Sequence, residues 1–92
     1  RLRLDPARRL ALVENGEKIS LTNPEFRLLR LLMNRPGYIF QNDEIIRSVW
    51  GMAGVSDQTA LKNVVYRLRK KLGEDWEYLI QTSPGGYSFL ED

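Results

Sequence analysis

The sequence predicts a small α+β domain in which strands come first, three helices follow and a β-hairpin closes the chain. Three observations support this prediction. Strand-like alternation occupies residues 1–21, helical periodicity occupies residues 22–72, and short β-like runs return after Gly73. A length of 92 residues allows one modest core, so we expect a single domain spanning residues 1–92.

The first segment has the pattern of strands joined by a tight turn. Residues 1–4 alternate, and residues 9–14 and 17–21 flank the dipeptide Asn15-Gly16. Asn-Gly readily adopts the positive φ angles of a type I′ turn, which joins the strands of a two-residue hairpin. We therefore expect an N-terminal antiparallel sheet with such a turn.

A first helix is predicted to begin at Thr22. The segment Thr22-Asn-Pro-Glu25 places a capping hydroxyl and a reciprocating carboxylate three residues apart, with proline in the first turn, where it is tolerated. The expected core-facing residues of this helix are Phe26, Leu29, Leu32 and Met33. Pro36-Gly37 is expected to end it.

A second, shorter helix is predicted near residues 42–50. Its expected core-facing residues are Ile45, Ile46, Val49 and Trp50. Gly51 stops it, because glycine accepts the backbone angles that end a helix. We expect Trp50 and, later, Tyr87 to serve packing, because buried aromatic side chains contribute large apolar areas.

The third helical pattern, residues 59–72, combines an apolar stripe with a basic outer face and contains no acid. The stripe consists of Leu61, Val65, Leu68 and Leu72. The opposite face carries Thr59, Lys62, Asn63, Tyr66 and Lys70, with Arg67 alongside. Ser56 or Asp57 can cap the start of the helix. A helix anchored by one face can push cations into a DNA groove, although a charge run is more often a solvated face.

A hairpin is predicted after the basic helix. Residues 78–82 and 87–90 form short β runs around Ser83-Pro84-Gly85-Gly86, where proline sets the first turn angle and glycine takes the positive one. A helix, a loop, a basic helix and a hairpin in this order describe a winged helix-turn-helix. In that arrangement the hairpin, called the wing, lies beside the groove that the basic helix occupies.

Several short motifs occur in a specific order along nearly the whole chain. They are Leu21-Thr22 with Glu25-Phe26-Arg-Leu-Leu29, Arg35-Pro36-Gly37, Val49-Trp50-Gly51, Arg67-Leu-Arg-Lys-Lys-Leu72-Gly73, and Ile80-Gln-Thr82 with Gly86-Tyr87. With these motifs the chain resembles the C-terminal effector domain of OmpR/PhoB-family response regulators. The resemblance implies a sequence-specific, double-stranded-DNA-binding transcription regulator, the output domain of a two-component system. Its recognition helix would run from about residue 57 to residue 72.

The resemblance also implies partners. The loop after the second helix lies where family members contact RNA polymerase, and its residues here are Gly51, Met52, Ala53, Gly54 and Val55. Dimeric or tandem binding on DNA and a receiver domain in the full-length protein are likewise implied. The Ser56-Asp57 opening and the Thr82-Ser-Pro84 turn are also similar to the ToxR/CadC-like branch, in which a membrane tether is common. The architecture of the full-length protein therefore stays open.

We expect DNA contacts from the outer face of the basic helix and from the wing, namely from Thr59, Lys62, Asn63, Tyr66, Arg67, Lys70, Ser83 and Gly85. Asn63 is the candidate for direct readout, because an amide can form two hydrogen bonds with an adenine edge. The wing is one residue shorter than is usual in the family and lacks its arginine, so we expect it to act through shape and backbone. Arg69 flanks the apolar stripe and could pair with a local acid instead of reaching DNA.

The chain has no cysteine and no histidine. Their absence excludes thiolate metal sites, disulfides and the usual general base, so we expect no catalytic residues, no metal and no cofactor. There is no membrane-spanning run and no signal peptide, and we expect a cytoplasmic protein. Because the chain starts at Arg1 without methionine, we expect a fragment of a longer regulator.

The alternative function is a winged helix that serves only as a protein-interaction module. The same basic face would then meet an acidic protein surface. A net charge of +2 is too small to decide between the two readings.

Overall fold

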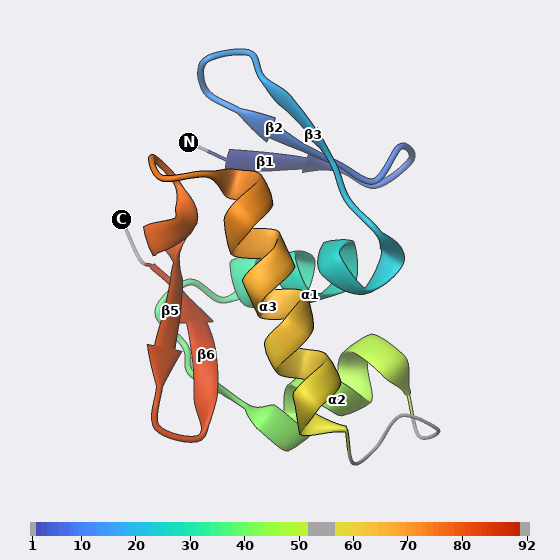
Figure 1. Cartoon of the computed structure of the whole chain (residues 1–92), viewed down its shortest axis with the longest axis vertical. Helices are drawn as coiled ribbons and strands as arrows, with labels where there is room; N and C mark the ends of the chain where they lie inside the picture. The colour runs from blue at the N-terminus through green and yellow to red at the C-terminus, as the bar shows by residue number, and fades with distance from the viewer. Residues whose placement is uncertain (1, 52–56, 91–92) are drawn as a thin grey trace.

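A three-stranded antiparallel sheet covers one end of the helices (Figure 1). The structure is a computed structural model that describes residues 2–51 and 57–90. The strands are β1 (Leu2–Asp5), β2 (Leu10–Val13) and β3 (Lys18–Ser20), in the order β1-β2-β3. Ala11 pairs with Ile19, and both side chains are buried. The expected N-terminal antiparallel sheet is confirmed.

The turn between β2 and β3 is not the expected type I′ turn. Gly16 has a φ of 94°, but among the described non-glycine residues only Arg9 has a positive φ, so Asn15 does not supply the other positive angle. The Gly16 N–H donates to Val13 O at 2.8 Å, and the Val13 N–H donates to Glu17 O at 2.9 Å. This is a three-residue loop with glycine in the last position. The Asn15 side chain stabilises it by accepting a hydrogen bond from the Glu17 N–H at 2.8 Å.

Helix α1 (Asn23–Asn34) begins where the capping signal predicts. The Thr22 N–H donates to Glu25 Oε1 at 2.9 Å, and the Glu25 N–H donates to Thr22 Oγ1 at 3.4 Å. The buried residues of α1 are Glu25, Phe26, Leu28, Leu29 and Leu32. Leu28 was outside the predicted stripe but is buried, because helices pack on two sides of α1 and cover more of its surface than one stripe. Met33, which was expected in the core, is only half-buried.

Helices α2 (Asn42–Trp50) and α3 (Gln58–Leu72) also match the predicted bounds closely. Gly51 ends α2 with a φ of 75°. Asp57 caps α3, because its Oδ1 accepts a hydrogen bond from the Ala60 N–H at 2.9 Å; the alternative cap, Ser56, lies outside the described residues. The buried residues of α3 are Leu61, Val64, Val65, Leu68 and Leu72. Trp50 is half-buried against the core, as a packing role requires.

The wing belongs to a second three-stranded sheet. Strands β5 (Ile80–Ser83) and β6 (Gly86–Phe89) form the expected hairpin, and β4 (Phe40–Gln41) pairs with β6 on its other side. β4 was not predicted, since two residues are too short to show alternation. The expected strand from residue 78 begins only at Ile80, because residues 77–79 form the 3-10 helix η2 (Glu77–Leu79).

Gly86 is required by the close approach of β4. A Cβ atom at this position would lie 2.1 Å from the backbone oxygen of Phe40 and 3.2 Å from the Ile39 side chain. No other residue type fits there without moving β4 away from β6.

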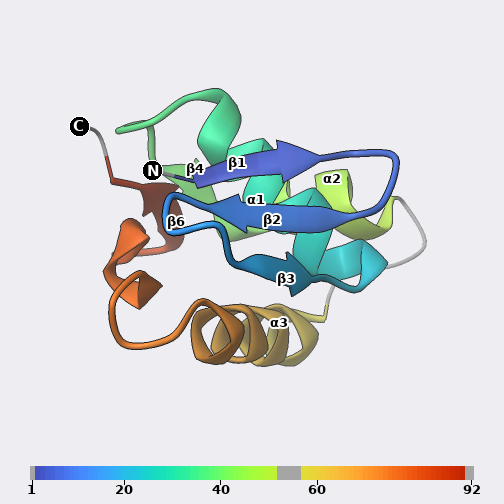
Figure 2. The same ribbon diagram turned by 90° about the horizontal axis from the view of Figure 1, so that it is seen from above.

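α3 runs along the long axis of the molecule, from α2 at one end to the N-terminal sheet at the other (Figure 1). The wing lies beside it, and the hairpin tip is at the same end as the start of α3. Seen from above, β3 is the N-terminal strand nearest to α3 (Figure 2). The winged helix-turn-helix fold is thus confirmed. None of the helices in the described ranges combines the length and apolar content needed to cross a membrane.

Candidate nucleic-acid interface

The six predicted residues of α3 form one exposed surface, which we call the outer face of α3. Every one of its side chains is exposed, and they are Thr59, Lys62, Asn63, Tyr66, Arg67 and Lys70. This surface exists because the buried stripe holds the opposite side of the helix in the core. It offers cations, an amide and hydroxyl groups with no acid among them.

Tyr66 and Lys70 support each other on this surface. The Lys70 Nζ atom lies 5.7 Å from the centre of the Tyr66 ring, one helical turn away. The tyrosine side chain is 63% exposed, although it is large and partly apolar. An exposed aromatic ring that also orients a cation is suited to contact a partner.

Arg69 does not lie on the outer face, and it forms no ion pair with an acid among residues 2–51 and 57–90. Its Nη2 atom donates to Ile80 O at 2.6 Å and to Thr82 Oγ1 at 2.8 Å, so the guanidinium group contacts strand β5 of the wing. The suggestion of a local acidic partner was therefore wrong. The free carbonyl and hydroxyl oxygens of a neighbouring strand cannot be recognised in the sequence.

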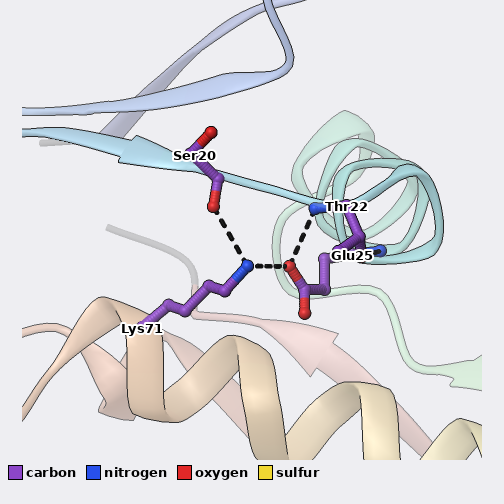
Figure 3. A network of polar contacts seen from close by, with 4 residues as sticks. All are labelled: Ser20, Thr22, Glu25 and Lys71. Atoms are coloured by element: carbon purple, nitrogen blue, oxygen red, sulfur yellow. Dashed lines mark hydrogen bonds and ion pairs between the residues drawn. The ribbon is translucent and has the colours of Figure 1, made fainter.

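Lys71 faces the opposite flank of α3 and has a structural role. Its Nζ atom lies 2.6 Å from Glu25 Oε1 and donates to Ser20 O at 3.1 Å, and the same Glu25 oxygen accepts from the Thr22 N–H (Figure 3). The network joins the end of β3, the start of α1 and the last turn of α3. Sequence reasoning found the capping role of Glu25 but not this ion pair.

Glu25 is ionised despite being almost completely buried, with 1% of its surface exposed. Burial raises the pKa of its carboxyl group, but the Lys71 and Thr22 hydrogen bonds and the Lys71 charge outweigh burial, so the pKa lies below its ordinary value. The buried carboxylate is thus a fixed anchor for the end of α3.

Three cations of the outer face stay available to an external anion. Within residues 2–51 and 57–90, no ion pair involves Lys62, Arg67 or Lys70. The basic character of α3 therefore divides into a solvent-facing part and two cations, Arg69 and Lys71, that hold the helix in place.

The two predicted wing residues lie at the hairpin tip. Gly85 is exposed and takes a φ of 75°, and Ser83 is half-buried opposite Gly86. Gly85 O accepts a hydrogen bond from the Asn42 N–H at 2.9 Å, which ties the tip to the start of α2. The tip carries no cation, so its polar groups are backbone groups and the Ser83 hydroxyl.

The predicted polymerase-contact loop is described only at its first residue. Gly51 is the C-cap of α2. Met52, Ala53, Gly54 and Val55 lie outside the described residues.

Comparisons with known proteins agree on the kind of domain. The family described as "Transcriptional regulatory protein, C terminal" matches residues 16–89. The transcriptional regulatory protein PcoR of Escherichia coli is 38% identical over 84 residues, which are 90% of this chain and 37% of PcoR. The chain thus spans little more than a third of that relative.

Solved structures with this fold include DNA-binding domains. The DNA-binding domain of Bacillus subtilis CssR superimposes with a TM-score of 0.83 at 30% identity, covering 98% of this chain and 100% of that one. The Klebsiella pneumoniae RstA DNA-binding domain, solved in complex with the RstA box, gives 0.76 at 28% identity, covering 97% of this chain and 90% of that one.

Proposed function

The chain belongs to the OmpR/PhoB-type family of C-terminal domains of transcriptional regulatory proteins, and on this basis we propose that it regulates transcription by binding double-stranded DNA sequence-specifically. The observation that carries the proposal is the outer face of α3. It is exposed along the whole helix, it has no acid, and its three cations have no ion pair within the described ranges. RstA, a relative in fold and sequence, has been solved with its DNA box.

The outer face divides into groups for affinity and groups for selectivity. Lys62, Arg67 and Lys70 would neutralise phosphates, which gives affinity for any duplex. Asn63 would read a base edge in the major groove, and Tyr66 would contact sugar, phosphate or base. The wing tip would approach the DNA phosphate backbone through the Ser83 hydroxyl and the turn amides.

The remaining roles concern the longer protein. We propose that this domain is the output module of a cytoplasmic two-component response regulator and has no catalysis of its own. In that protein a receiver domain or a membrane tether would accompany it, the loop that starts at Gly51 would contact RNA polymerase, and two copies would bind as a dimer or in tandem. Repeated half-sites would compensate for the small surface of a single module.

A salt titration tests the proposal. We expect the 92-residue chain to bind a random-sequence duplex pool weakly, with a log-affinity versus log-salt slope of about −2.7 for three phosphate contacts. Selection from a random duplex library should recover a sequence that binds more tightly than the pool. Affinity that does not depend on salt, or a selection that converges on no sequence, would contradict the proposal and favour the protein-interaction reading.

A further inference from the structure

Arg69 is the link between α3 and the wing. Within the described part of the chain, its hydrogen bonds to Ile80 O and Thr82 Oγ1 are the only side-chain hydrogen bonds that join α3 to β5 or β6. The two acceptors belong to the β5 residues that precede and follow Gln81. A planar guanidinium group can bond two acceptors at once, whereas an ammonium group acts as a point charge.

The opposite flank of the same helical segment is held by Lys71. Residues two apart on an α-helix point in nearly opposite directions. Lys71 accordingly contacts Ser20 O and Glu25 on the body of the domain, while Arg69 contacts the wing. Lys71 thus fixes the end of α3 to β3 and α1 on one side, and Arg69 fixes the wing to α3 on the other.

We propose that Arg69 is a positioning residue that holds the wing at a set distance from the outer face of α3, so that helix and wing engage one duplex together. This inference rests on the proposed DNA binding. Arg69 is half-buried, whereas its neighbours Arg67 and Lys70 are exposed. Its guanidinium group is already engaged by the wing, so it contributes to specificity through geometry and not through a phosphate contact.

Thr82 allows the contact between Arg69 and the wing to be tested from the wing side. Its side chain accepts from Arg69, and its backbone lies in the ladder opposite Tyr87, one residue before Ser83 at the tip. Thr82→Val removes the hydroxyl acceptor while keeping the shape of the side chain. Arg69→Met removes the donor of this contact, and Thr82→Val removes one of its acceptors. Both variants should therefore loosen the attachment of the wing to α3.

The free protein is tested first, by amide hydrogen exchange. Arg69→Met should accelerate exchange of the β5 and β6 amides roughly tenfold relative to the N-terminal half of α3, since the wing loses its tie to the helix. Arg67→Met, which removes an exposed cation from the same helix, serves as the matched control and should leave wing exchange unchanged. Equal wing exchange in the Arg69→Met variant and the parent chain would overturn the proposal.

DNA binding is tested second, with the duplex recovered by selection and with the random pool. Arg69→Met should lower the ratio of specific to random affinity roughly tenfold, with an unchanged salt slope, whereas Arg67→Met should flatten the slope by about one unit. Thr82→Val should lower the ratio as well, and the double variant should be no worse than Arg69→Met. If Arg69→Met flattens the slope by about one unit and Thr82→Val has no effect, Arg69 contacts phosphate and the proposal is wrong.

The two arms separate this inference from the proposed function. If the parent chain shows no salt-dependent affinity for DNA, the proposed function fails, and the exchange experiment still reports whether Arg69 holds the wing. If the parent chain binds DNA while Arg69→Met leaves wing exchange unchanged, only the positioning role of Arg69 fails. The same holds if the parent chain binds DNA while Arg69→Met and Thr82→Val leave the ratio of specific to random affinity unchanged.

Discussion

Lys71 on α3 and Glu25 on α1 are 46 positions apart in the sequence, and their Nζ and Oε1 atoms lie 2.6 Å apart. The same carboxylate oxygen accepts the Thr22 N–H that opens α1. One buried oxygen atom therefore connects the start of the first helix to the end of the proposed recognition helix. This connection and the buried stripe together hold α3 against the rest of the domain.

Removing the cation of this pair should cost more stability than removing the anion. Lys71→Met leaves a buried carboxylate without its cation, and we expect a loss of about 1–3 kcal/mol in the free energy of unfolding. Glu25→Gln keeps an oxygen that can accept from Thr22 and leaves a lysine that is 36% exposed and reaches water, so its cost should be smaller. Urea unfolding measures both.

Lys70→Met is the matched control for Lys71→Met, because it removes the exposed neighbouring lysine and should change stability by about 0.5 kcal/mol or less. Equal losses in the Lys70 and Lys71 variants would show that the ion pair contributes nothing. The double variant of Lys71 and Glu25 should lose less than the sum of the single losses.

The stability of the domain should depend on the ionisation of Glu25 at acidic pH. The folded pKa of this carboxyl group lies below its ordinary value of 4.5, so its contribution is present above that value and is lost as pH falls through the folded pKa. The parent chain should therefore lose stability more steeply than Glu25→Gln below about pH 4.5. Urea unfolding at a series of pH values gives both slopes, and parallel slopes would contradict the assignment.

Gly86→Ala should destabilise the domain through a steric clash. A methyl group there would lie 2.1 Å from Phe40 O, and separating β4 from β6 should cost about 3 kcal/mol. Gly16→Ala is the comparison, because its φ is also unfavourable for alanine but nothing lies within 4 Å of the added carbon; its cost should be about 1 kcal/mol. Thermal unfolding that ranks Gly16→Ala as the more harmful change would refute this explanation.

The outer face of α3 should separate affinity from selectivity. Lys70→Ala should weaken binding to selected and random duplexes alike and flatten the salt slope by about one unit. Asn63→Ala should cost roughly 1–3 kcal/mol on the selected duplex and little on the random pool. Gel-shift titrations at several salt concentrations measure both effects.

Arg30→Ala is the charge-matched control for Lys70→Ala. Arg30 is exposed on α1, five residues after Glu25, and therefore on the side of the helix that faces away from α3. Its removal should leave the salt slope nearly unchanged. Equal slopes for the Arg30 and Lys70 variants would mean that net charge, and not the outer face of α3, governs binding.

The sequence alone determined the features that depend on three or four adjacent residues. The capping pair Thr22 and Glu25 and the helix stop at Gly51 predicted helix bounds correctly, because a cap is a contact between near neighbours in the chain. Asp57, which caps α3, was one of the two caps that the sequence offered. The apolar stripe of α3 predicted which side would face solvent. The proposed contacts of that exposed side with DNA remain predictions.

Features that depend on partners far along the chain became visible only in the folded structure. Helical periodicity placed Lys70 on the outer face and Arg69 beside the apolar stripe, but the contact of Arg69 with the wing and the ion pair of Lys71 with a buried carboxylate could not be read from the sequence. β4 exists because β6 offers it a pairing edge, and Gly86 is required because β4 lies against it. The conformational preference of a long, flexible side chain or a two-residue strand is too weak to predict its partner from the sequence. Its role is therefore set by the groups that folding brings within reach.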